Sequence, residues 1–225
     1  MGVPEPAGRA SILPIYLACD LSSSMGDGGR IEALRDAVAA LRDAIWLNPV
    51  VSDCARIAIV GFASRAWLAL PLCDLALVDE LPVLEPNGLT SYAAVFRLLR
   101  DTIRADVEQL AGDDLRVWRP LVFFVSDGEP TDQAAQWRAA HARLVDRTFA
   151  GSPEIVAFAV GDASAATLAT VATSRCFVAR SGTAVRDAIA EIGGIVIRSV
   201  VASSASGVPA VPDTPPDGFD ELDLV

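Results

Sequence analysis

The 225-residue sequence contains no lysine, because all 18 of its basic residues are arginine. A P-loop nucleotide site and a lysine-assisted phosphotransferase both use a lysine against the phosphates. A Schiff-base enzyme needs a lysine amine as its nucleophile. The missing residue type therefore argues against all three classes of enzyme.

Histidine and cysteine are scarce as well. The single histidine, His141, lies in the stretch AAQWRAAHARLVD, which has helical spacing and no nucleophile motif, so we expect it on a helix surface. A histidine-based triad or a zinc site with several histidines is not expected. The four cysteines are far apart and form no Cys-x-x-Cys pair: Cys19, Cys54, Cys73 and Cys176. We expect free thiols in a reducing compartment.

Long apolar runs are also missing, since no stretch approaches the roughly 18 residues that cross a bilayer. The N-terminal stretch MGVPEPAGRASILPIYLAC has one basic residue and an apolar run interrupted by Pro14, which is not typical of a secretion signal. We therefore expect a cytoplasmic protein. The net charge of -11 predicts that the chain binds neither nucleic acid nor an anionic membrane.

The residues that are present alternate between apolar, β-rich runs and amphipathic helical ones. This order predicts an α/β fold with a doubly wound, mostly parallel central sheet flanked by helices. The pair 55–63 and 66–72 is separated by two residues and predicts a hairpin, hence one antiparallel edge strand. The other expected strands are 12–19, 121–126, 154–161 and 176–179, and the expected helices are 30–46, 74–81, 90–110, 134–149, 163–172 and 183–201.

The composition changes after residue 201. Residues 11–201 form the predicted domain, whereas residues 202–225 are rich in proline, serine and acidic residues and predict a flexible tail. Within it, residues 207–225 carry five acidic residues and no basic one. This acidic tail 207–225 is either a solvated extension, which the composition favours, or a segment that contacts a partner or a neighbouring copy of the chain.

Oxygen-bearing side chains follow two of the most apolar strands. Asp20 ends the first run and is followed by Ser22 and Ser24, and Asp127 follows LVFFVS. Thr90 lies between them at the expected start of a helix. Ligands bind at the carboxyl ends of strands in an open parallel sheet, and an all-oxygen set suits Mg²⁺ or Mn²⁺. These residues are also ordinary helix caps and turn formers, which is the alternative.

Three stretches carry a resemblance to a known family. They are DLSSSM, GLTS and VSDG, and together they resemble the metal-ion-dependent adhesion site (MIDAS) of von Willebrand factor A domains. The likeness covers about residues 11–201 and is closest to the bacterial tellurium-resistance-associated, TerY-like proteins, on LPIYLACDLSSSM, WRPLVFFVSDGEPTD and AFAVGD.

The resemblance implies a function as well as a fold. Ser22, Ser24 and Thr90 would supply hydroxyl ligands to Mg²⁺ or Mn²⁺, and Asp20 and Asp127 would hold the ion largely through water. A carboxylate from a protein partner would complete the coordination. TerY-like proteins further imply a cytoplasmic stress response, with a protein kinase or a metal-dependent phosphatase as partner.

Two other functions remain open from the residues. The chain could be an adaptor subunit of an ATPase machine, which would be a separate protein because no nucleotide motif is present. A Mg²⁺-dependent phosphatase-type hydrolase built on Asp20 needs a second aspartate at position 22 and a lysine, and the chain has neither. A serine hydrolase lacks the G-x-S-x-G motif and a base. We therefore expect no enzyme activity.

Overall fold

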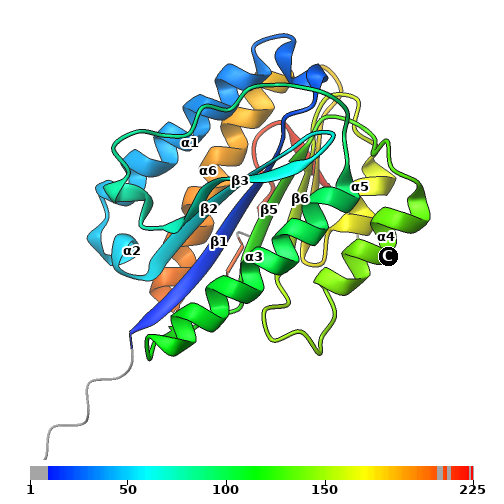
Figure 1. Ribbon diagram of the computed structural model, residues 1–225. Helices are drawn as coiled ribbons and strands as arrows, with labels where there is room; N and C mark the ends of the chain where they lie inside the picture. The colour runs from blue at the N-terminus through cyan, green and yellow to red at the C-terminus, as the bar shows by residue number, and fades with distance from the viewer. Residues whose placement is uncertain (1–9, 207–209, 212–213, 223, 225) are drawn as a thin grey trace, which may run out of the picture.

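The computed structural model describes residues 10–206, 210–211, 214–222 and 224. The strands that it describes form one sheet in the order β3-β2-β1-β5-β6-β7-β8, with β4 beside this path on β1 (Figure 1). The strands are β1 (Ser11–Asp20), β2 (Ala55–Phe62), β3 (Ala66–Cys73), β4 (Arg116–Val117), β5 (Leu121–Ser126), β6 (Glu154–Ala159), β7 (Arg175–Ala179) and β8 (Phe219–Leu222). The helices are α1 (Arg30–Trp46), α2 (Pro49–Cys54), α3 (Tyr92–Gly112), α4 (Ala134–Leu144), α5 (Ala165–Val171) and α6 (Val185–Ser206), with the 3-10 turns η1 (Ser23–Gly26) and η2 (Leu75–Leu77).

The pairing of the strands confirms the predicted fold class. β1 pairs in parallel with both β2 and β5, and the parallel pairing continues through β6 to β7. β3 runs antiparallel to β2 and is the predicted antiparallel edge strand. A second antiparallel strand, β8, lies at the opposite edge of the sheet, next to β7.

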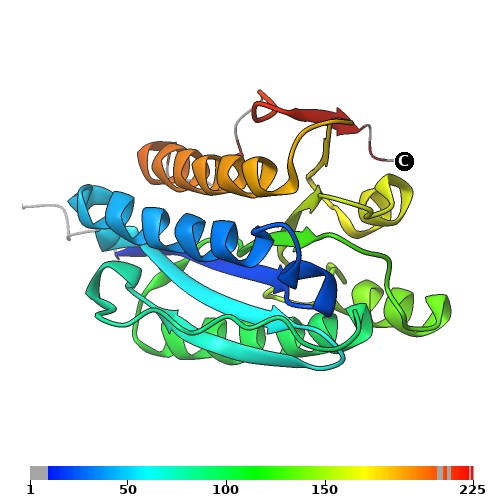
Figure 2. The same cartoon turned by 90° about the horizontal axis from the view of Figure 1, so that it is seen from above.

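Helices cover both faces of the sheet (Figure 2). On one face α1 and α6 pack over the odd-numbered residues of β1, such as Ile15 and Leu17. On the other face α3 packs over the even-numbered ones, Tyr16 and Ala18, while α4 packs against α3 and α5 covers β6 and β7. Because successive side chains of a strand point to opposite faces, Asp20 belongs to the second series, at the carboxyl end of the strand.

The C-terminal segment corrects the predicted boundary and tail. α6 continues to Ser206 instead of ending at residue 201, and residues 219–222 form β8. Phe219 is fully buried and makes an edge-to-face contact with Phe158, with ring centroids 6.0 Å apart. A flexible tail was therefore the wrong prediction for these four residues, because an aromatic anchor and a free sheet edge hold them. Residues 207–209, 212–213, 223 and 225 of the predicted tail lie outside the described residues.

Two local predictions are corrected as well. The expected helix at 74–81 is only the single 3-10 turn η2. His141 lies on α4 as expected but is partly buried: its Nε2 is 2.9 Å from the carbonyl oxygen of Val171, and its ring packs edge-on against Phe96. Burial lowers the pKa of His141, so a neutral imidazole fits this contact between α4 and α5.

The four cysteines are free, as predicted. Burial raises the pKa of the Cys19 thiol to about 12 and that of Cys176 to about 11, so both pack as neutral apolar groups.

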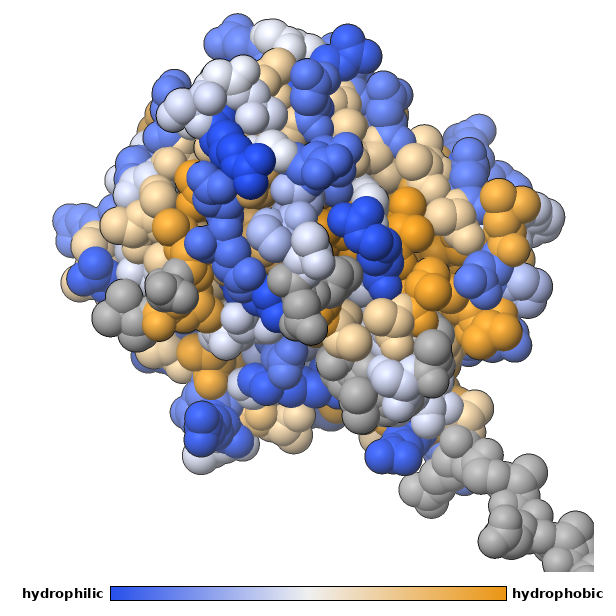
Figure 3. Space-filling model, turned by 180° about the vertical axis from the view of Figure 1, so that it is seen from behind, coloured by the Kyte–Doolittle hydropathy of each residue, from blue (hydrophilic) through white to orange (hydrophobic). Residues whose placement is uncertain are grey.

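Figure 3 shows the face of the molecule behind the view of Figure 1, where hydrophilic residues lie between apolar ones. Among the described residues, none of the helices is both long and apolar enough to span a membrane.

Candidate metal site at the carboxyl edge of the sheet

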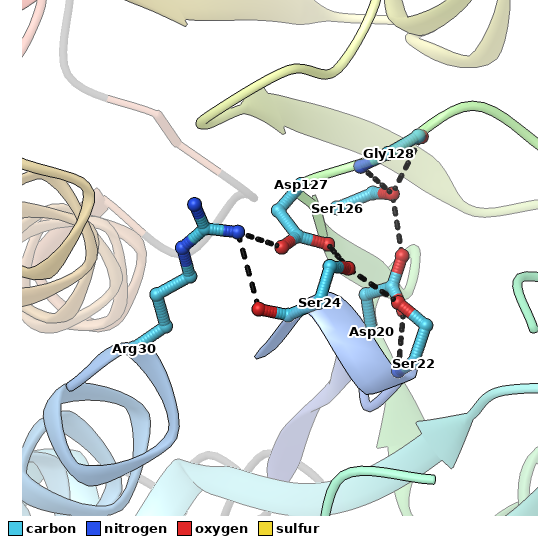
Figure 4. Close-up of polar contacts among 7 residues, drawn as sticks. All are labelled: Asp20, Ser22, Ser24, Arg30, Ser126, Asp127 and Gly128. Atoms are coloured by element: carbon cyan, nitrogen blue, oxygen red, sulfur yellow. Dashed lines mark hydrogen bonds and ion pairs between the residues drawn. The ribbon is translucent and has the colours of Figure 1, made fainter. Parts of the chain in front are cut away.

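Two aspartates meet at the carboxyl edge of the central strands. Asp20 is the last residue of β1, and Asp127 directly follows β5. These strands are adjacent and parallel, with Cys19 opposite Val125, so both chains leave the sheet at the same place. Both carboxylates are buried, and Figure 4 shows them facing one another across a group of serine hydroxyls. The parallel pairing is what brings together residues that are 107 positions apart in the sequence.

Asp20 is held by two hydrogen bonds. Its Oδ1 accepts from the backbone N–H of Ser22 at 2.8 Å, and its Oδ2 accepts from the Ser126 hydroxyl at 2.7 Å. Burial raises the pKa of Asp20 to about 6, and the nearby Asp127 carboxylate contributes to the rise, although the hydrogen bonds from Ser126 and Ser22 oppose it. The ionised carboxylate therefore lacks a compensating positive charge, which a bound cation would supply.

The predicted serines lie on the same side of the turn that follows β1. Ser22 precedes the 3-10 turn η1, and Ser24 is inside it. Their hydroxyl oxygens are 3.1 Å apart, and the Ser24 hydroxyl donates a hydrogen bond to Oδ1 of Asp127 at 2.8 Å. The tight turn thus brings alternate residues together and connects the β1 end to the β5 end.

Thr90 reaches the same edge from the segment before α3. Its carbonyl oxygen accepts bonds from the N–H and the hydroxyl of Thr131, at 2.8 and 2.9 Å. A Cβ built on Gly128 would lie 3.9 Å from the Thr90 hydroxyl oxygen, so this hydroxyl faces the chain after Asp127. Ser91, not Thr90, is the N-cap of α3, since its hydroxyl accepts from Ala94 N–H.

The Thr90 hydroxyl is therefore not needed for the helix cap. Thr90 is only 5% exposed, and no residue in the described part of the chain forms a hydrogen bond with its hydroxyl. This hydroxyl is not one of the fully enclosed polar atoms that lack a partner among the described residues, so it remains open to an added ligand. An ion bound between the two strand ends would provide that partner.

Two residues of the site were not singled out from the sequence. Ser126, the last residue of β5, is fully buried and bonds Asp20. The sequence pattern could have identified it, because side chains two positions apart on a strand point to the same face. Ser126 therefore shares the face of Val122 and Phe124, on which Asp20 also lies. Arg30, the first residue of α1, donates to Oδ2 of Asp127 at 2.6 Å. A basic residue in the first turn of a helix is unfavourable with respect to the helix dipole. This unusual position was the only feature of the sequence that could have pointed to Arg30.

The donor set fits a hard divalent cation. The hydroxyls of Ser22 and Ser24 lie beside the two carboxylates, with the Thr90 hydroxyl near Gly128, and such oxygen ligands suit Mg²⁺ or Mn²⁺. Over the residues that the structure describes, no group of three or more histidine, cysteine, aspartate or glutamate side chains could hold a metal. An ion at this edge would therefore depend on hydroxyl ligands in addition to the two carboxylates.

The fold is similar to that of solved structures, among them a von Willebrand factor type A structure. Proximal thread matrix protein 1 from the mussel byssus matches with a TM-score of 0.63 and 17% identity, over 86% of this chain and 49% of that chain. Another structure of that protein has a zinc-occupied MIDAS motif and matches with a TM-score of 0.61 and 16% identity, over 86% and 48%.

Two further structures extend this comparison. A von Willebrand factor type A structure from Catenulispora acidiphila has a TM-score of 0.58 and 15% identity, over 83% of this chain and 43% of that chain. The pilus adhesin SpaC from Lactobacillus rhamnosus GG has a TM-score of 0.65 and 12% identity, over 85% and 30%. The chain thus spans about half or less of the length of these structures.

The fold and the site together define a doubly wound α/β domain with an all-oxygen site at its carboxyl edge. More specifically, the chain has the von Willebrand factor A fold. Neither a protein-family model nor a curated protein matches the sequence.

Proposed function

We propose that this chain is a metal-dependent protein-interaction module of the von Willebrand factor A type. Mg²⁺ or Mn²⁺ would bind to the hydroxyls of Ser22, Ser24 and Thr90, with Asp20 and Asp127 holding the ion largely through water and hydrogen bonds. The observation that carries the proposal is the Thr90 hydroxyl, which belongs to a residue only 5% exposed, has no hydrogen bond within the described residues and lies near Gly128, the residue after Asp127.

The proposed site recognises a partner and does not turn over a substrate. An ion with mainly neutral ligands keeps much of its charge and attracts an anionic group, such as a carboxylate on another protein. Leu89, next to Thr90, is 62% exposed and offers apolar contact beside the ion. We therefore expect a partner that presents an acidic side chain next to an apolar one.

The biological setting is a further proposal, supported by the sequence resemblance to TerY-like proteins. It would be a cytoplasmic stress response of the tellurium-resistance kind, with a protein kinase or a metal-dependent phosphatase as partner. The likeness to a pilus adhesin favours a setting outside the cell instead. Capture of partners from the native cell, with and without EDTA, distinguishes these settings and also the alternative of an ATPase adaptor.

Metal binding is tested by calorimetry with Mg²⁺ and Mn²⁺, and with Zn²⁺ because a neighbour of the same fold holds zinc. We expect one site, lost in both Asp20→Ala and Asp127→Ala while circular dichroism shows an intact fold. Asp101→Ala is the matched control, since Asp101 pairs with Arg104 on the exposed face of α3. Unchanged affinity in both site variants would disprove the assignment.

The role of Thr90 is tested against its neighbour. Thr90→Ala should weaken metal binding and, more strongly, partner capture, because it removes a ligand oxygen. Ser91→Ala removes the helix cap instead and should lower stability by about 1 kcal/mol with little change in metal affinity. Equal effects of the two substitutions on metal binding would show that Thr90 is not a ligand.

A further inference from the structure

Arg30 places a positive charge directly on the candidate metal site. Its Nη1 donates to Oδ2 of Asp127 at 2.6 Å and to the carbonyl oxygen of Ser24 at 3.2 Å (Figure 4). The side chain of Arg30 is 19% exposed, and that of Asp127 is not exposed at all. The contact is therefore a largely desolvated, charge-assisted hydrogen bond, which is stronger than a surface ion pair.

Helix stability does not explain this position. Arg30 is the first residue of α1, where the helix dipole disfavours a cation. The other arginines of α1 make unrelated contacts, since Arg35 donates to the Leu84 carbonyl and Arg42 pairs with the adjacent Asp43. The side-chain contacts of Arg30 within the described residues go to the site, to Asp127 and to the Ser24 carbonyl.

The charges at the site then follow a simple balance. Counted as formal charges, the carboxylates of Asp20 and Asp127 balance a divalent cation, even though they would hold it largely through water. The guanidinium of Arg30 adds one positive charge, so the loaded site keeps a net charge of one, which a single carboxylate from a partner can neutralise. Repulsion between Arg30 and the ion also weakens the binding of the metal alone.

We propose that Arg30 is a specificity-determining residue that offsets the charge of Asp127. The loaded site then keeps a net positive charge, which favours an acidic partner. This inference rests on the proposed function and adds a residue that sets its preference for anions. It has a distinctive consequence: removing the charge of Arg30 affects the two binding steps in opposite directions. Metal alone binds more tightly, and the carboxylate that completes the site binds more weakly.

The test uses the full chain, Mn²⁺ alone, and then acetate as the carboxylate probe. Calorimetry gives the Mn²⁺ affinity with and without acetate for the wild type, Arg30→Gln, Arg30→Lys and Arg42→Gln. We expect Arg30→Gln to bind Mn²⁺ about tenfold more tightly and to lose the gain in affinity that acetate produces in the wild type. Arg30→Lys keeps the charge and should behave like the wild type. Arg42→Gln changes the net charge equally at a distant exposed pair and should also leave both steps unchanged.

The outcomes separate this inference from the function on which it rests. If the wild type binds no Mn²⁺, the metal-site proposal fails and the role of Arg30 fails with it. If the wild type binds Mn²⁺ but Arg30→Gln binds it equally or more weakly, the role of Arg30 alone is overturned. An Arg30→Lys variant that behaves like Arg30→Gln would also overturn it, because the charge is then not the cause.

Discussion

Two acidic regions of this molecule differ in how their charge is compensated. At the carboxyl edge, Asp20 and Asp127 are buried side by side, and the single arginine there, Arg30, pairs with Asp127 among the described residues. On β8, Asp220 is exposed and Glu221 is partly exposed, and each pairs with an arginine. Asp220 pairs with Arg180 at 2.7 Å, and Glu221 pairs with Arg175 at 2.8 Å, on or next to β7.

The difference concerns charge balance more than the number of acids. The β8 pairs are neutral in themselves, so this region has no electrostatic need for a further cation. The carboxyl edge has two buried carboxylates and one guanidinium, so it keeps a negative charge in a desolvated place. A buried excess charge is costly without a counter-ion, whereas exposed balanced pairs contribute little. The comparison supports the proposal that the first region binds an ion, whereas the buried Phe219 suggests that packing holds the second.

The largest expected effect tests whether packing holds β8. Phe219→Ala should lower the free energy of unfolding by about 3–5 kcal/mol, because it removes a fully buried ring from the contact with Phe158. Urea unfolding measures the change. The control is Leu224→Ala, which truncates a partly exposed residue two positions after β8 and should cost far less. Equal costs would mean that β8 is not anchored by its phenylalanine.

The next effect concerns the pH dependence of the metal-free protein. Because the pKa of Asp20 is raised from 3.8 to about 6, the folded state binds this proton more tightly than the unfolded state does. The contribution of Asp20 to the free energy of unfolding therefore falls as the pH rises from about 4 to about 6, by at most about 3 kcal/mol.

Urea titrations in EDTA across this pH range measure that contribution. Asp20→Asn cannot ionise, so the difference between the wild type and this variant isolates Asp20 from the other carboxylates. We expect the wild type to lose stability relative to the variant as the pH rises. A difference that does not change with pH, or that changes in the opposite direction, would contradict the buried, uncompensated carboxylate.

The smallest effect is expected at the β8 ion pairs. Glu221→Gln and Asp220→Asn should each change the free energy of unfolding by about 0–1 kcal/mol, because these pairs are screened by solvent. The change should shrink further in high salt. A loss of more than about 2 kcal/mol would show that charge, and not Phe219, holds β8, and the contrast between the two regions would no longer stand.

The sequence by itself determined the central sheet and the edge of the sheet at which the candidate site residues lie. Continuous apolar runs such as 12–19 and 121–126 are typical of buried parallel strands, and the structure has β1 and β5 there. Helical spacing located α1 at residues 30–46. The carboxyl ends of parallel strands lie at the same edge of a sheet. Asp20, which ends β1, and Asp127, which follows β5, therefore had to lie close together. These features depend on local periodicity and on a general rule of topology, so sequence was sufficient.

Only the tertiary structure decided which individual side chains touch. Ser91 caps α3 and leaves the Thr90 hydroxyl facing Gly128, although either residue suits a cap. Arg30 reaches Asp127 across 97 residues of sequence, and no periodicity encodes such a contact. The sequence of β8 is short, acidic and preceded by prolines, which does not predict a strand. The strand forms because Phe219 packs against Phe158 and because β8 pairs with the edge of β7. Contacts between distant segments depend on how the whole chain packs, and local sequence does not contain that information.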